Sequence, residues 1–174
     1  TGDEVAALRE AILAANTSPD DYEIQLPAGT YALGILGAGE DAAAIGDLDI
    51  LAGGSVRIVG VGAESTTINA ADLFDVDLGY GDRVFDVHAG AVVEFEGLTI
   101  TGGHTPVDGS SLKSVEFRGG GIRNTHGRIT IAGSRLVDNV ADRDGGGIYS
   151  ESEQLLSISG STFSENVSGW RGGA

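Results

Sequence analysis

Two groups of acidic residues are spaced closely enough along the chain to bind a hard cation. Asp75, Asp77 and Asp82 lie in one segment that is otherwise apolar and glycine-rich. Calcium takes about six to eight oxygen ligands, and carboxylates in loops often supply them. The second group consists of Glu40, Asp41, Asp47 and Asp49. Neither group follows the ligand order of an EF-hand loop, so calcium is a candidate cofactor without a defined coordination set.

A further acidic pair consists of Asp138 and Glu165, which lie 27 residues apart. If these positions are neighbours in space, their like charges repel, and either a bound cation or plain solvation would relieve the repulsion. Two carboxyl groups about 5 to 9.5 Å apart are also what glycoside hydrolysis requires. The pair is therefore a calcium candidate. If the two residues stack, their carboxyl groups would also meet the lower limit of the separation that glycoside hydrolysis requires.

Other reactive residue types show no pattern that predicts catalysis. His88, His104 and His126 are far apart and lack the spacing of metal ligands. Each glycine triplet is followed by a strand pattern and not by a helix, which argues against a phosphate-binding loop. The chain contains no cysteine, so disulfides and thiolate metal sites are excluded. We predict no catalytic residue.

The element that positions these residues is an internal repeat. Gly119–Ile122 and Gly145–Ile148 have the same sequence, Gly-Gly-Gly-Ile, and a third glycine pair begins at Gly172. Asn139 and Asn166 recur with the 27-residue spacing. Repeats of this length indicate a solenoid. Asparagine suits sharp turns and stacks well, so the two residues are expected to form a structural turn ladder.

Within each repeat, apolar and polar residues alternate, as in Ile129–Ile131 and Val93–Phe95, which predicts short strands with one buried face. We predict an all-β, right-handed, single-stranded parallel β-helix of about five coils in one domain, residues 1–174, with the coils in 22–174. Longer spacings upstream place insertions near 34–47, 70–83 and 104–114. An antiparallel sandwich also has short alternating strands, but it gives no reason for a fixed repeat length.

The N-terminal 18 residues have helical periodicity. Val5, Leu8 and Ile12 fall on one stripe, and Pro19 ends the helix. A solenoid exposes apolar side chains at its ends, so residues 1–18 are expected to form a helix that caps the first coil. A helix on a membrane surface would carry more basic residues.

The net charge of −16 opposes binding to nucleic acid. Apolar runs are too short to cross a bilayer, so membrane insertion is not expected. Hydrophobic residues make up 41% of the chain, which excludes a disordered tail.

Several of these segments resemble known repeat proteins. Leu8-Arg-Glu-Ala-Ile12 and Ile24-Gln-Leu-Pro-Ala-Gly-Thr-Tyr31 are similar to the N-terminal segment of large secreted bacterial β-helix proteins, usually written C-S-L-R-E-A-I and followed by LPAGTY. Ala6 and Ala7 replace the Cys and Ser of that motif. The Gly-Gly-Gly-Ile units and Phe163-x-x-Asn166 resemble the GGA(I/L/V) and FxxN repeats of polymorphic outer-membrane proteins. The resemblance implies a β-helix, export to the exterior or the cell surface, and adhesion, with no shared catalytic residues.

The sequence thus favours a non-enzymatic structural or adhesive module that contacts surface glycans or a host surface. A polysaccharide-active lyase or hydrolase is the alternative. The last coil is expected to be open, so another copy, in an end-to-end filament, or a further β-helix segment would cover it. Trp170 and Arg171 are candidate partner contacts, since Trp and Arg dominate interface hot spots.

Overall fold

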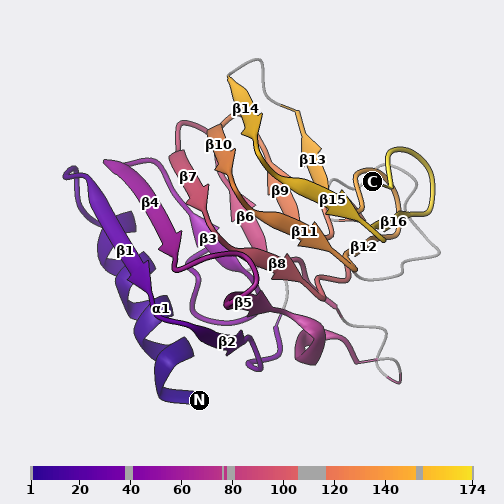
Figure 1. Ribbon diagram of the computed structural model, residues 1–174, viewed down its shortest axis with the longest axis horizontal. Coiled ribbons are helices and arrows are strands. Elements are labelled where there is room, and N and C mark those ends of the chain that lie inside the picture. Colours follow the sequence, from indigo (N-terminus) through magenta and orange to yellow (C-terminus); the bar gives the residue numbers. More distant parts are fainter. Residues whose placement is uncertain are drawn as a thin grey trace.

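The chain folds into parallel β-sheets preceded by one helix in the described residues of the computed structural model, which are 2–37, 41–75, 77, 81–105, 117–151 and 155–173 (Figure 1). Every strand pairing given for these residues is parallel. The architecture is therefore mostly β, and the antiparallel sandwich is excluded.

Most strands belong to three sheets. Sheet A has the order β1 (Tyr22–Leu26), β4 (Ser55–Gly60), β7 (Val92–Glu96), β10 (Arg128–Ala132) and β14 (Leu156–Ser159). Sheet B has the order β2 (Gly29–Ala32), β5 (Thr66–Asn69), β8 (Thr99–Thr101), β11 (Arg135–Val137) and β15 (Thr162–Ser164). Sheet C has the order β3 (Leu48–Ile50), β6 (Phe85–Val87), β9 (Ile122–Asn124) and β13 (Ile148–Ser150). A short pair joins β12 (Val140–Ala141) to β16 (Val167–Ser168), and η1 (Ala71–Leu73) is a 3-10 turn.

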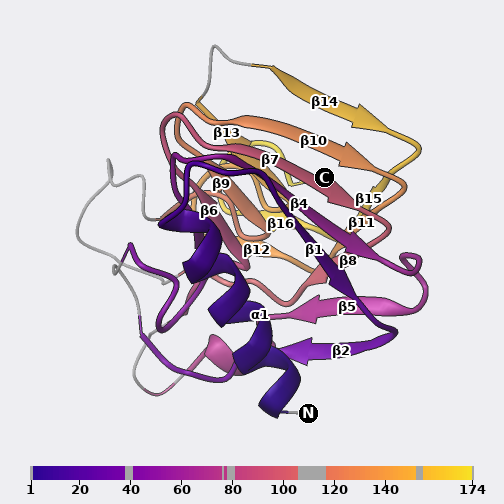
Figure 2. The same ribbon diagram turned by 90° about the vertical axis from the view of Figure 1, so that its left-hand side faces the viewer.

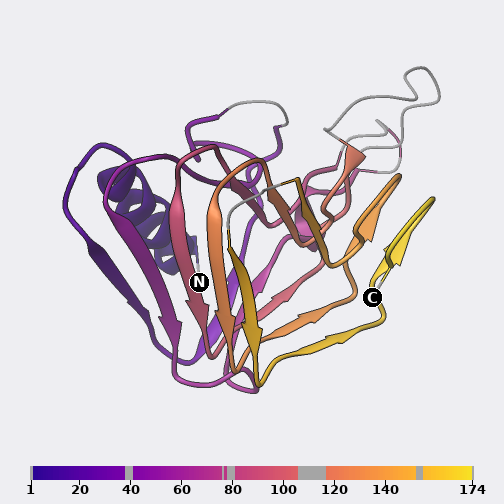
Figure 3. The same ribbon diagram turned by 90° about the horizontal axis from the view of Figure 1, so that it is seen from above.

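The chain passes through the sheets in a fixed sequence, from A to B to C and back to A. We call one such passage a circuit. In Figure 3 the strands of sheet A follow one another in chain order from indigo to yellow. The register agrees with the repeat, because Ile131 pairs with Ile158 and Leu136 pairs with Phe163.

The core lies between the three sheets. Alternate residues of each strand point inward, so that equivalent side chains of successive circuits stack, and this arrangement buries each apolar row without a helix between the strands. The largest fully buried side chains include Phe85, Phe95, Ile58, Ile68 and Ile100. The ring centres of Phe85 and Phe95 lie 4.6 Å apart, so the two aromatic side chains pack against each other within the core.

The glycine triplets are required by the backbone. The first glycine of each triplet, Gly119 or Gly145, has a positive φ of 69°, and Gly172, which begins the glycine pair, has a φ of 67°. The second glycine of a triplet lies too close to a neighbouring backbone segment to carry a side chain, since a Cβ on Gly120 would lie 2.5 Å from the Val140 carbonyl oxygen. Only glycine meets both demands without strain.

Helix α1 (Gly2–Asn16) lies across the N-terminal end of the sheets, which faces the viewer in Figure 2. Val5, Leu8 and Ile12 are buried, as the predicted capping stripe requires. Asn16 completes the cap, because its amide nitrogen donates to the Asp49 carbonyl oxygen at 2.8 Å and its amide oxygen accepts from the Leu51 N–H at 3.0 Å. The helix thus covers apolar side chains and also satisfies backbone groups at the edge of β3.

The predicted insertions at 34–47 and 70–83 both lie between a strand of sheet B and the next strand of sheet C. The third, at 104–114, lies at the same place in its circuit, but residues 106–114 are outside the described residues. The described parts of the first two insertions bring charged residues onto the outer face of sheet C.

Candidate functional site

The outer face of sheet C carries a row of charged side chains that are buried. Leu48, Phe85 and Ile122 belong to the core, so the next residue in each strand points to the opposite face. These next residues are Asp49, Asp86 and Arg123, which are paired in register and are 0%, 1% and 6% exposed. Outward-facing residues in a sheet normally contact water, so the insertions must cover this row.

The insertions add their own charged residues, Asp47 from the first and Asp82 and Arg83 from the second. The Nη1 of Arg83 lies 3.0 Å from the Asp47 carboxylate and 3.6 Å from those of Asp82 and Asp86. Asp82 also accepts hydrogen bonds from the backbone N–H groups of Asp47, at 3.3 Å, and Arg83, at 3.0 Å. We refer to Asp47, Asp49, Asp82, Arg83, Asp86, His88 and Arg123 as the charged layer.

Arg123 and His88 contact the remaining carboxylates. Arg123 donates to both oxygens of Asp86, through Nε at 2.9 Å and through Nη2. This two-pronged geometry is the strongest form of an arginine–carboxylate pair. The Nε2 of His88 lies 2.9 Å from the Asp49 carboxylate. Each carboxylate of the layer therefore has a bonded donor, as buried charges require.

Burial shifts the pKa values of this layer. Desolvation raises the pKa of Asp82 to about 6, although the charge of Arg83 opposes the change. Desolvation also raises the pKa of Asp49, and it raises that of Asp47 well above its usual value. The hydrogen bond to Asp49 raises the pKa of His88. The folded state therefore binds protons at these groups more tightly than the unfolded chain does.

Arg9 connects the capping helix to the charged layer. Its guanidinium donates to the carbonyl oxygens of Ala43, at 2.9 Å, Asp47, at 3.0 Å, and Gly46, and the residue is buried. Sequence reasoning missed this role. The signal was present, since Arg9 follows Val5 by four residues and precedes Ile12 by three, and so lies on the apolar stripe.

The calcium candidates have different surroundings. Asp75 and Asp77 form a local turn, in which the Asp75 carboxylate accepts from the Asp77 N–H at 3.0 Å, whereas Asp82 is part of the charged layer. Asp138 and Glu165 are both exposed and both have a positive φ, of 54° and 58°. They are therefore the left-handed turn residues, a role that the sequence assigned to the asparagines that follow them.

Acidic oxygens do converge in the charged layer. One oxygen each from Asp47, Asp49 and Asp86 lies within 4.8 Å of the others, and Asp41, Asp49 and His88 form a second such group. The first group already pairs with two arginines, since Arg83 contacts Asp47 and Arg123 contacts Asp86. A divalent cation placed there would meet positive charge as well as negative charge, so this donor set does not fit calcium.

Asn139 and Asn166 stack in successive circuits and bond to each other. The amide nitrogen of Asn139 donates to the amide oxygen of Asn166 at 3.0 Å, and its backbone N–H donates to the same oxygen at 3.2 Å. Both side chains also donate to carbonyl oxygens of the preceding circuit, at Ile100 and Leu136. The predicted ladder is thus built from buried side chains that tie circuits together.

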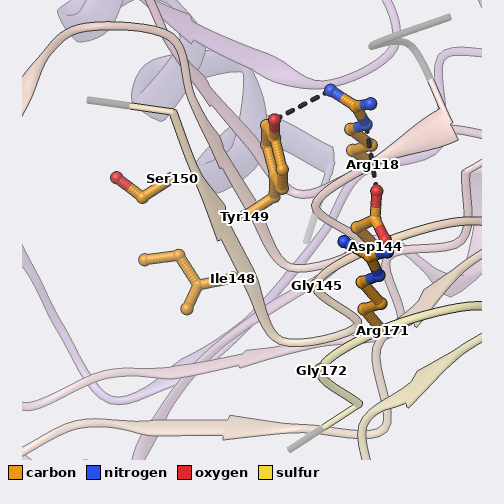
Figure 4. Close-up of a pocket in the computed structure, with 8 residues that line it drawn as sticks. All are labelled: Arg118, Asp144, Gly145, Ile148, Tyr149, Ser150, Arg171 and Gly172. Carbon is orange, nitrogen blue, oxygen red and sulfur yellow. Dashed lines mark hydrogen bonds and ion pairs between the residues drawn. The ribbon is translucent and has the colours of Figure 1, made fainter. Parts of the chain in front are cut away.

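The C-terminal end of sheet C borders an open groove of about 450 Å³ (Figure 4). Arg118 lies there, donating to the Tyr149 hydroxyl at 2.8 Å and pairing with Asp144 at 3.2 Å. Trp170, 65% exposed, lies near this end with the guanidinium carbons of Arg143 and Arg171 at 4.7 and 5.2 Å from its ring centre. The predicted partner contacts are therefore at the surface.

The other two histidines, His104 and His126, lie in a packed ring contact and in a turn. His104 stacks on Phe74 with ring centres 3.9 Å apart, and burial lowers its pKa. His126 is exposed and has a positive φ of 73°, as a turn residue would.

No family model, curated protein or solved structure matches this chain. Among the described residues, no helix is both long enough and apolar enough to cross a membrane.

Proposed function

We propose that this chain is a right-handed parallel β-helix module with a structural or adhesive role on the cell exterior. Three observations support the winding. The chain visits sheets A, B and C in a repeated order, the strands are parallel, and equivalent residues of successive repeats are in register. Export and adhesion rest on the resemblance of its repeats to those of secreted and surface β-helix proteins.

The observation that carries the non-enzymatic role is the use of the charged layer. A catalytic acid or base must reach a substrate, so it needs an open path to solvent or to a cleft. Asp47, Asp82 and Asp86 are instead at most 3% exposed and are bonded to Arg83 and Arg123. These contacts join the insertions to sheet C, which is a structural task.

A polysaccharide assay tests this role against the enzymatic alternative. The purified chain is incubated with pectate, alginate and similar polymers, with and without calcium, and both turnover and retention on the insoluble polymer are measured. We expect retention or no interaction, without turnover. Turnover that is lost in Asp138→Asn or Glu165→Gln, but not in the exposed control Asp72→Asn, would replace the structural role with the enzymatic one.

The winding has its own test. A crystal structure in which the path from sheet A through sheet B to sheet C is left-handed, or in which the sheets are separate layers, would contradict the β-helix. The outcome of the polysaccharide assay does not depend on this result, so the two parts of the proposal can fail separately.

A further inference from the structure

The last circuit leaves one edge of each sheet without a neighbouring strand in the described residues. We call the edge formed by β13, β14, β15 and β16 the C-terminal edge. Inward side chains are poorly covered there, since Ile158 of β14 is 44% exposed whereas its neighbour Ile131 in β10 is fully buried. Phe163 of β15 is likewise only partly buried, while Leu136 of β11 is fully buried. An edge with uncovered apolar side chains is suited to accept another strand.

Residues 171–173 already continue the pairing past this edge. The N–H groups of Gly145, Gly146 and Gly147 donate to the carbonyl oxygens of Arg171, Gly172 and Gly173 at 2.8, 3.0 and 3.2 Å. One circuit earlier, Gly119, Gly120 and Gly121 donate in the same way to residues 144–146. Residues 171–173 therefore lie in register with residues 145–147, and the groove of Figure 4 lies beside β13, where a further parallel strand would bind.

The asparagine ladder specifies one residue of a strand that would bind at this edge. The Asn166 amide oxygen accepts from the backbone N–H and the amide nitrogen of Asn139, which lies one circuit earlier. By the same geometry, the backbone N–H and the second amide hydrogen of Asn166 point toward the place of an amide oxygen one circuit further. A buried donor without an acceptor costs about 1–3 kcal/mol, so an asparagine is the residue that fits.

A row of alternating charge specifies a second residue. Arg118, Asp144 and Arg171 occupy equivalent positions in successive circuits, with Arg118 paired to Asp144 at 3.2 Å and Asp144 next to Arg171 across a parallel bridge. Sheet A shows the same alternation, since Arg57 lies in register between Glu23 and Glu94. A carboxylate therefore fits the position that follows Arg171.

We infer that the C-terminal edge binds a parallel β-segment of the repeat type, with apolar residues over Ile148, Ile158 and Phe163, an asparagine over Asn166 and an acid over Arg171. This inference rests on the proposed winding. A head-to-tail second copy fits less well, because α1 covers the end of the first circuit that such a copy would have to present.

The sequence of residues 122–144 supplies all of these features. It has Ile122, Ile131 and Leu136 at the apolar positions, Asn139 for the ladder and Asp144 for the charge row. In the folded chain these residues pair with, or stack on, the very positions that form the C-terminal edge. A peptide of this sequence is therefore a matched probe.

The test titrates that peptide into the full chain and measures amide hydrogen exchange by mass spectrometry. The control peptide carries Asn139→Leu and Asp144→Arg. We expect the parent peptide to slow exchange about tenfold in residues 155–168, because exchange through local opening slows as the edge becomes occupied. Residues 22–26, in β1 at the opposite end, should not change.

Three outcomes would overturn the inference. These are no protection at millimolar peptide, equal protection by the control peptide, and protection at β1 in place of β14 and β15. None of them concerns turnover or retention of polysaccharide, so the structural or adhesive role would stand or fall independently.

Discussion

Removing the side chain of Asn139 tests how strongly the ladder holds successive circuits together. Asn139 is fully buried, and its amide nitrogen donates to the carbonyl oxygens of Ile100, at 3.0 Å, and Val137, at 3.1 Å, and to the side chain of Asn166, at 3.0 Å. Its amide oxygen accepts from the Gly103 N–H at 3.1 Å. Asn139→Ala leaves all of these groups without that partner.

The magnitude follows from the number of bonds lost. A hydrogen bond contributes about 1 kcal/mol to stability, and a buried group left unpaired costs about 1–3 kcal/mol. An amide nitrogen has two hydrogens for its three acceptors, so one of the bonds is shared. We expect Asn139→Ala to lower the free energy of unfolding by about 3–4 kcal/mol. In a chain of this length, that corresponds to a fall of about 10 °C in Tm.

Urea unfolding followed by circular dichroism measures this loss. The matched control is Asn69→Ala, because the Asn69 oxygen accepts one exposed hydrogen bond, from the Ala71 N–H, and should cost less than about 1 kcal/mol. A second variant, Asn139→Asp, keeps the shape of the side chain, but its carboxyl group can donate a hydrogen bond only when it is protonated. Asn139→Asp should therefore be less destabilising at a pH where this group is protonated than at a pH where it is ionised. If Asn139→Ala costs no more than Asn69→Ala, the ladder does not hold the circuits together.

Three further predictions concern the core, the charged layer and the cap. Ile131→Ala should cost about 2–5 kcal/mol of unfolding free energy, whereas Ile158→Ala should cost clearly less because that side chain is 44% exposed; equal losses would contradict the open edge. Since the pKa of folded Asp82 is raised to about 6, the stability that it contributes is fully present below its unfolded pKa and is lost as pH rises through 6. Stability measured between pH 4 and pH 7 should therefore fall with rising pH, and Asp82→Asn should flatten this slope while the exposed control Asp72→Asn should not. Arg9→Met should speed amide exchange in residues 42–47 and leave β10 unchanged; unchanged exchange in 42–47 would show that the guanidinium does not hold that segment.

The sequence by itself determined the circuits and their register. Apolar residues at alternate positions define which face of each strand is buried, and a fixed spacing places equivalent residues beside one another. The pairings of Ile131 with Ile158 and of Phe95 with Ile131 follow from this pattern. The capping stripe of α1 was also readable, because helical periodicity needs no tertiary information.

Tertiary structure alone decided where the charges lie. An aspartate in the middle of a strand, such as Asp49 or Asp86, has the pattern of an exposed residue, and it becomes buried because an insertion of unpredictable path folds over it. The pairing of Arg83 with Asp47 joins residues from two insertions that have no repeat in common. The loops obey no periodicity, so their contacts depend on the shape of the sheet that they cover, and that shape exists only once the circuits have stacked.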